Sequence, residues 1–149
     1  MLDGVAVLSA DGESGPLVDQ AEMFLRTNDR KLQRVLVVDD ERLIAETVTA
    51  ILNANGFEAV EAHNGEEALE AARKVRPDIV LSDVLMPKMS GVELGIKIRL
   101  EFPGTRIFLF SGQAATSELM RKARDDGHTF ELFFKPIHPE ELIAKLRGL

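Results

Sequence analysis

Short apolar runs alternate with longer amphipathic segments from about residue 32 to the end of the chain. The runs occupy residues 35–38, 57–62, 79–82, 107–110 and 132–134. In the segments between them, apolar residues recur with the spacing of one helix face, as at Ile44, Val48, Ile51 and Leu52. Short apolar runs separated by helical segments are typical of buried parallel strands. The pattern therefore predicts alternating strands and helices.

Five strands that alternate with five helices predict an α/β fold: a doubly wound five-stranded parallel sheet with helices on both faces. The expected helices cover residues 41–55 and 66–75, a segment that ends near Phe102, residues 115–125, and a segment that begins at His138. Asn55 and Gly56 predict a left-handed end for the first of these helices. Residues 32–149 should therefore form one domain.

Residues 1–31 carry no sustained hydrophobic period and are acidic and Gly-rich near residues 11–16. The stretch from Leu17 to Leu25 is long enough for two helical turns, and Pro16 is a helix start signal. We expect residues 1–31 to be an N-terminal extension that is flexible or contains one short helix.

The composition argues against several classes of function. The chain has 149 residues and a formal net charge of −7, which argues against direct nucleic-acid binding, because such binding needs clustered Lys and Arg. It has no Cys, which fits a reducing cytoplasm and leaves no thiolate ligand or cysteine nucleophile. No apolar run approaches the ~20 residues that span a bilayer, and the N-terminus lacks a secretory pattern. We expect a cytoplasmic protein that binds no membrane.

Polar residues with reactive groups directly follow four of the expected strands. These residues are Asp39 and Asp40, Asp83, Ser111, and Lys135. In an open α/β sheet, ligands bind just beyond the carboxyl ends of the strands, which meet at one edge. The sequence therefore predicts a site that combines carboxylates, a hydroxyl and an ammonium.

The carboxylates of Asp39, Asp40 and Asp83 would repel one another unless a cation offsets their charge. A hard divalent cation such as Mg²⁺ prefers oxygen ligands of this kind. For Asp39 and Asp40 alone, capping of the following helix is an equally good interpretation. Capping does not explain Asp83, because a loop with Pro87 and Gly91 follows it.

A strand-end carboxylate beside a metal ion can act as a nucleophile and form an aspartyl phosphate. Such a reaction needs a cation that holds the oxygens of the transferred group, and Lys135 would supply it. Ser111 would supply a hydroxyl that bonds a phosphoryl oxygen, and Gly112 would leave room for the group. A lone serine or lysine at a strand end is usually incidental, so the argument depends on their common edge.

The segments that carry these residues resemble the receiver domain of two-component response regulators. They read Val-Val-Asp39-Asp40-Glu41, Ser82-Asp83-Val-Leu-Met86-Pro87 followed by Gly91, Phe110-Ser111-Gly112, and Phe134-Lys135-Pro136. The resemblance covers about residues 32–149 and is specific as an ordered combination. It implies a flavodoxin-like fold with strand order 2-1-3-4-5.

The resemblance also implies a role for each residue of the expected site. The ligands of Mg²⁺ would be Asp39, Asp40, Asp83 and the backbone carbonyl of Leu85. Asp83 would be the phosphoacceptor, Ser111 the switch hydroxyl and Lys135 the phosphoryl-binding lysine. The Lys135–Pro136 bond would be cis, a form found almost only before proline.

The implied function is that of a response regulator in a phosphorelay. The protein would accept a phosphoryl group from a sensor histidine kinase or phosphotransfer protein and switch its contacts with a downstream protein. It would catalyse its own phosphotransfer and a slow autodephosphorylation without being an enzyme for another substrate. Because the chain ends just after the last expected helix, we expect a stand-alone receiver that is a monomer or weak dimer.

Three positions depart from the usual family pattern. Leu132 stands where receivers usually have the Tyr or Phe that couples to the switch hydroxyl. The segment from Gly127 to Lys135 is one residue longer than usual, which predicts a β-bulge that re-aims Phe130 or Phe133. Leu85 is bulky and apolar at a position that tunes attack by water, so a long-lived phosphoform is expected.

Two surfaces are candidates for contact with partners. Leu43 lies beside the acidic residues but off the core stripe of its helix, so Leu43, Glu46 and Ala50 form a candidate docking surface for the phosphodonor. Regulated contacts are expected at the face formed by the last two helices and the last strand, which carries Arg121, Lys122, Arg124 and Lys145.

Two other functions share parts of this pattern. A haloacid-dehalogenase-type phosphatase also uses a strand-end Asp with Mg²⁺, but its two acids are one residue apart, which Asp39-Asp40-Glu41 does not match. A degenerate receiver that acts as a phosphorylation-independent interaction module would normally have lost an acid or the lysine. The full set in this chain favours a working receiver.

Overall fold

A five-stranded parallel sheet forms the centre of the computed structural model, which describes residues 32–112 and 116–149. The strands are β1 (Arg34–Val38), β2 (Glu58–Ala62), β3 (Ile79–Asp83), β4 (Arg106–Ser111) and β5 (Glu131–Phe134). Their order across the sheet is β2-β1-β3-β4-β5, and all neighbours are parallel. The predicted fold class and strand order are thus confirmed.

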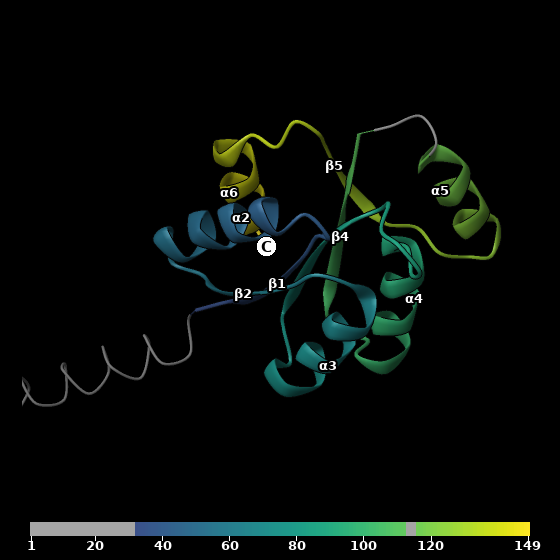
Figure 1. Cartoon of the computed structure of the whole chain (residues 1–149), viewed down its shortest axis with the longest axis horizontal. Helices are drawn as coiled ribbons and strands as arrows, with labels where there is room; N and C mark the ends of the chain where they lie inside the picture. Colours follow the sequence, from purple (N-terminus) through teal and green to yellow (C-terminus); the bar gives the residue numbers. More distant parts are fainter. Residues whose placement is uncertain (1–31, 113–115) are drawn as a thin grey trace, which may run out of the picture. The chain divides into compact units, whose positions relative to one another are not determined.

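Helices cover both faces of this sheet, as predicted. They are α2 (Arg42–Ala54), α3 (Gly65–Val75), α4 (Gly91–Glu101), α5 (Thr116–Asp125) and α6 (Pro139–Arg147). In Figure 1, α2 and α6 lie on one face of the sheet, whereas α3, α4 and α5 lie on the other. Each strand thus leads to a helix, and the predicted site residues lie at the strand ends and in the connecting loops at the carboxyl edge.

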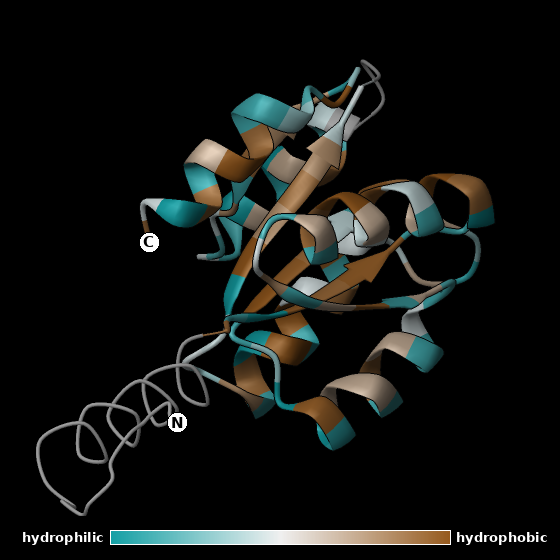
Figure 2. Cartoon of the chain, turned by 90° about the vertical axis from the view of Figure 1, so that its left-hand side faces the viewer, coloured by the Kyte–Doolittle hydropathy of each residue, from teal (hydrophilic) through white to brown (hydrophobic). Residues whose placement is uncertain are grey.

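The core consists of two apolar clusters, one on each face of the sheet. Successive strand residues alternate between them, so that Val35 and Val37 belong to the α2–α6 side and Leu36 and Val38 to the other. All four are buried. In Figure 2 the central strands are mainly brown, the colour of hydrophobic residues, whereas the helices carry both brown and teal, the colour of hydrophilic residues. Burial on both faces explains why the strands read as continuous apolar runs.

Helix ends near the carboxyl edge are fixed by side-chain caps. The side chain of Asn64 accepts a hydrogen bond from the backbone of Glu67 at the start of α3. At the start of α4, Ser90 and Glu93 form a reciprocal capping box. At the C-terminal end of α2, just before β2, Gly56 has φ of +91°, which confirms the predicted left-handed end of this helix.

The other expectations for the fold have mixed outcomes. β5 pairs with β4 residue by residue from Glu131 to Phe134, so the predicted bulge within this strand was wrong, and any extra residue lies in the loop before it. The expected extension, residues 1–31, lies outside the described residues. In the described ranges, no helix has the length and apolar character needed to cross a membrane.

Candidate functional site

The three predicted acids meet at the carboxyl edge of the sheet. Asp39 and Asp40 follow β1, and Asp83 is the last residue of the neighbouring strand β3. One carboxylate oxygen from each lies within 4.8 Å of the other two. Asp39 is buried, Asp40 is exposed and Asp83 is intermediate. The cluster therefore opens to solvent on one side.

The backbone at the end of β1 fixes Asp39 in this cluster. Its amide donates to the carbonyl of Ala62 on β2 at 3.2 Å. Its Oδ1 accepts a hydrogen bond of 2.9 Å from the backbone amide of Glu41, which precedes α2. Capping of α2, the alternative role for these acids, would account for this one bond only. The N-cap residue of α2 is Glu41, and its side chain makes no capping hydrogen bond.

Burial strongly affects the ionisation of Asp39. Removal from water raises the pKa of Asp39 to about 6, and the neighbouring carboxylates of Asp83 and Asp40 add to this rise. The Glu41 amide and the charge of Lys135 act in the opposite direction but do not cancel it. A buried carboxylate whose charge is insufficiently offset is a favourable position for a cation.

Lys135 faces Asp83 across the carboxyl edge of the sheet. Its Nζ lies 3.1 Å from Asp83 Oδ1. The Lys135 amide donates to the carbonyl of Ser111 at 3.0 Å, which continues the pairing of β4 with β5. The Lys135–Pro136 bond is cis, as the resemblance implied. The strand-end Asp, Ser and Lys are thus brought to one edge, as predicted.

Gly112 allows the lysine stem to lie close to the loop after β4. A Cβ at this position would lie 3.0 Å from Cβ and 3.3 Å from Cδ of Lys135. A side chain at this position would therefore crowd the methylenes of Lys135. Ser111, which precedes this glycine, is buried at the end of β4.

Two further residues hold Asp83 in position, and sequence reasoning gave neither this role. The hydroxyl of Ser82 donates to the Asp83 carbonyl at 2.9 Å. Gly91, the first residue of α4, lies directly against the same carbonyl, where any Cβ would collide with it. Gly91 was visible in the sequence motif, but only the folded chain brings it back onto the acid eight positions earlier.

The donor set fits a hard divalent cation. All the side-chain ligand atoms that converge are carboxylate oxygens, which Mg²⁺ prefers over nitrogen or sulfur donors. The site combines one buried and one exposed acid beside Asp83, so bound water could complete the coordination. Leu85, whose carbonyl is the remaining predicted ligand, lies two residues beyond Asp83 on the loop that leads to α4.

A hollow of about 700 Å³ adjoins the site on the α5 side of the sheet. Ser111 and Phe134 are paired in register across β4 and β5, and both line the hollow. The Phe134 side chain is 71% exposed, whereas Leu132 is half-buried in the apolar cluster on this face. Phe133 points to the opposite face, 5.4 Å from the ring of Phe108.

This fold and site define a receiver domain. Residues 35–147 match the family described as the response regulator receiver domain. The match covers most of the chain, which therefore belongs to this family of two-component signalling proteins. Receiver domains interact with histidine kinases and generally bind Mg²⁺ at an acidic pocket, and the clustered acids of this chain are consistent with that property.

Among curated proteins, the chain is similar to full-length regulators from mycobacteria. It is 36% identical over 125 residues to the probable transcriptional regulatory protein TcrX of Mycobacterium tuberculosis, covering 84% of this chain and 53% of TcrX. It is 33% identical over 120 residues to the DNA-binding response regulator MtrA of Mycolicibacterium smegmatis, covering 80% and 51%. The chain thus spans about half the length of these relatives.

Among solved structures, the chemotaxis protein CheY4 of Vibrio cholerae is similar to this chain along nearly the whole length of CheY4. The two superpose with a TM-score of 0.69 and 32% sequence identity, covering 78% of this chain and 98% of CheY4. A receiver domain protein from Clostridium thermocellum gives a TM-score of 0.70 with 26% identity, covering 78% of this chain and 93% of that one. The described domain therefore corresponds to a whole receiver.

Proposed function

We propose that this receiver accepts a phosphoryl group on Asp83 from a sensor histidine kinase or a phosphotransfer protein, with Mg²⁺ bound by Asp39, Asp40, Asp83 and the Leu85 carbonyl. The observation that carries the proposal is the convergence of three carboxylates with the ammonium of Lys135, 3.1 Å from Asp83. A structural role for the acids alone would not need a lysine at this place.

In the proposed reaction, a carboxylate oxygen of Asp83 attacks the phosphorus of a phosphohistidine in line with the leaving nitrogen. The new O–P bond forms as the P–N bond breaks, and the imidazole leaves with the bonding pair. Bound Mg²⁺ offsets the negative charge on the acids and on the transferred group. Lys135 moves from the Asp83 oxygen to an oxygen of the phosphoryl group.

The new phosphoryl group would be read by Ser111. Its hydroxyl donates to a phosphoryl oxygen, and the end of β4 then adjusts to the added charge. Because Phe134 is paired with Ser111 and lines the same hollow, this change alters the surface between β5 and α5. A downstream protein that binds this surface would then distinguish the two states.

The reaction would end when water attacks the phosphoryl group on Asp83, which makes the receiver a catalyst of its own dephosphorylation. The Leu85 side chain, 37% exposed and two residues beyond Asp83 in the sequence, offers no hydrogen bond to such a water. A slow reversal is therefore part of the proposal.

The test is phosphorylation of the purified chain by acetyl phosphate, followed by intact mass. We expect a gain of one phosphoryl group that requires Mg²⁺ and is lost in Asp83→Asn. Asp126→Asn, which changes an exposed acid outside the cluster, should be phosphorylated like the wild type. No gain from acetyl phosphate or from a phosphorylated kinase, despite Mg²⁺ binding, would favour a phosphorylation-independent interaction module.

A further inference from the structure

We propose that Gly65, the first residue of α3, is a positioning residue for the metal site. It would act through Met89, which lies on the loop of residues 84–90 between β3 and α4. This metal loop, as we call it, begins directly after Asp83 and contains Leu85. The inference rests on the proposed function, because it assigns to Gly65 a share in setting the affinity for Mg²⁺.

The contact between Gly65 and Met89 leaves no space for a side chain on the glycine. A Cβ at Gly65 would lie 2.9 Å from both Cβ and Cγ of Met89, and closer still to its sulfur. The sulfur could turn away, because it is near the end of a flexible side chain. The Met89 Cβ cannot, because it is bonded to the loop backbone, so a substitution at Gly65 must displace either the metal loop or α3.

The first turn of α3 is firmly held. Oδ1 of Asn64 accepts a hydrogen bond of 2.8 Å from the Glu67 amide. Oε1 of Glu67 in turn accepts one of 2.9 Å from the His63 amide. The His63 ring nitrogen Nε2 lies 2.7 Å from a carboxylate oxygen of Glu61 on β2. These bonds tie the start of α3 to the edge of the sheet and oppose its displacement.

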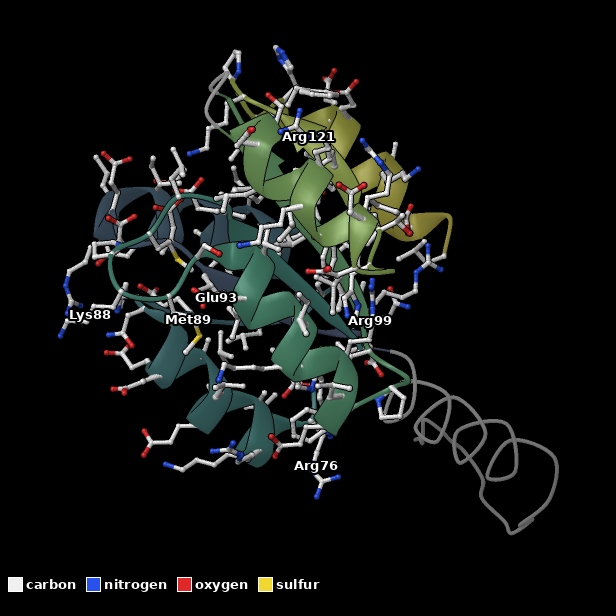
Figure 3. The ribbon with its side chains drawn as sticks, turned by 90° about the vertical axis from the view of Figure 1, so that its right-hand side faces the viewer. Arg76, Lys88, Met89, Glu93, Arg99 and Arg121 are labelled. Atoms are coloured by element: carbon white, nitrogen blue, oxygen red, sulfur yellow. The ribbon has the colours of Figure 1, made fainter. Side chains whose placement is uncertain are left out.

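The metal loop is the side that yields. Lys88, just before Met89, has φ of +70°, a conformation that lysine rarely adopts, so the loop already contains an unfavourable backbone conformation that a change at Met89 can relieve. The loop returns to its own start, where the Gly91 amide donates to the Val84 carbonyl at 2.8 Å. Figure 3 shows Lys88 at the outer edge of the loop and Met89 closer to the helices. A shift at Met89 therefore reaches the residues next to Asp83.

The location of this contact links it to the metal ligands. Gly65 and Met89 line a hollow of about 380 Å³ together with Asp40, one of the clustered acids. The Gly65–Met89 contact thus lies in the wall of a hollow that Asp40 also lines, and other residues of the metal loop line the same hollow. The absence of a side chain at Gly65 lets the loop pack against α3, and this packing sets the position of the Leu85 carbonyl relative to the carboxylates.

The test measures Mg²⁺ binding to the purified chain by isothermal titration calorimetry. Groups that orient metal ligands typically change affinity by about 10- to 100-fold, and we expect Gly65→Ala to weaken Mg²⁺ binding about tenfold. Gly104→Ala is the matched control, because a Cβ there meets nothing within 4 Å. Replacement of Met89 by Gly in the Gly65→Ala background removes the Cβ, Cγ and sulfur collisions and should restore most of the affinity.

A second readout separates positioning from a general loss of structure. The Mg²⁺ concentration for half-maximal phosphorylation of Asp83 should rise in Gly65→Ala, while the extent at saturating Mg²⁺ stays at the wild-type level. Unchanged Mg²⁺ affinity in folded Gly65→Ala, or no recovery in the double variant, would overturn the inference. Failure of the wild type to bind Mg²⁺ would instead contradict the proposed function.

Discussion

The ammonium of Lys135 lies 3.1 Å from a carboxylate oxygen of Asp83, although Asp83 ends β3 and Lys135 follows β5, with β4 between the two strands. Their side chains are only 29% and 14% exposed, so the pair is less screened by water than a surface ion pair. In the unphosphorylated receiver the lysine partly offsets the charge of the acid cluster. In the proposed phosphotransfer, the same ammonium would then hold an oxygen of the phosphoryl group on Asp83.

Lys135→Met, which keeps the length of the side chain but removes its charge, should slow phosphorylation of Asp83 by acetyl phosphate. Loss of one group that stabilises developing charge typically costs about 100-fold or more in rate. Intact mass followed over time measures the rate. Lys145→Met is the matched control, because this lysine is 53% exposed and lies 3.8 Å from Glu131, at the opposite end of β5. Equal rates in all three proteins would contradict the role of Lys135.

The stability of the metal-free protein should depend on Asp39 in a defined pH range. The pKa of Asp39 is raised from 3.8 to about 6, so the folded state binds its proton more tightly than the unfolded chain does. The free energy of unfolding should therefore fall as the pH rises from about 4 to about 6 and stay lower above that range. Added Mg²⁺ at neutral pH should reverse the loss.

Asp39→Asn tests this pH dependence, since Asn keeps an oxygen that can accept the bond from the Glu41 amide. In EDTA at neutral pH the variant should be more stable than the wild type by about 1–3 kcal/mol, an order of magnitude taken from the size of the shift. Urea unfolding across the pH range measures the difference. A variant that retains the full pH dependence of the wild type would show that another group causes it.

The pattern of the sequence was sufficient to predict the parallel sheet and the edge that carries the site. Buried parallel strands impose continuous apolar runs, and parallel connections place every strand end on the same side, so Asp39, Asp83 and Lys135 had to converge. The resemblance supplied the strand order and the cis bond before Pro136, which hydrophobic periodicity alone does not determine.

Close approaches of the backbone could not be predicted in the same way. A glycine that starts a helix has many explanations, and only the three-dimensional contact shows that Gly91 lies against the Asp83 carbonyl. The register of β5 was misjudged because a count of residues from Gly127 does not say whether an extra residue enters the strand or the loop. Pairing with β4, which is continuous, decides this.

The lifetime of the phosphoform should depend on Leu85. Leu85 lies two residues beyond Asp83, is 37% exposed, and its apolar side chain cannot hydrogen-bond a water molecule. Leu85→Asn supplies an amide that can hydrogen-bond an attacking water, so the aspartyl phosphate should decay severalfold faster than in the wild type. Decay is measured by intact mass after removal of acetyl phosphate. Leu100→Asn, at a 76% exposed position on α4, is the control. Equal or slower decay in Leu85→Asn would contradict the prediction.

Phe134 provides a direct optical test of the switch. The chain has no Trp and no Tyr, so Phe134→Trp introduces a single fluorophore at a position paired with Ser111. Acetyl phosphate and Mg²⁺ should change its emission, because the exposed ring borders the hollow that Ser111 also lines. The change should be absent when Asp83→Asn is added. An identical spectrum before and after complete phosphorylation would show that this surface does not respond.

Leu43 should matter for transfer from a protein donor but not from a small one. Its side chain is 75% exposed on the first turn of α2, next to the acids, and Glu46 and Ala50 extend the same exposed surface. Leu43→Glu should therefore reduce phosphotransfer from a histidine kinase or phosphotransfer protein by about tenfold or more, since an apolar anchor in an interface is replaced by a charge.

Acetyl phosphate provides the internal control for Leu43→Glu, because it needs the acids and Lys135 but no docking surface. Its rate of Asp83 phosphorylation should be the same in Leu43→Glu and the wild type. Leu100→Glu adds the same charge at an equally exposed leucine on α4 and should affect neither reaction. Equal losses with both donors would mean that the substitution disturbs the site itself. Unchanged transfer from a cognate kinase would remove Leu43 from the docking surface.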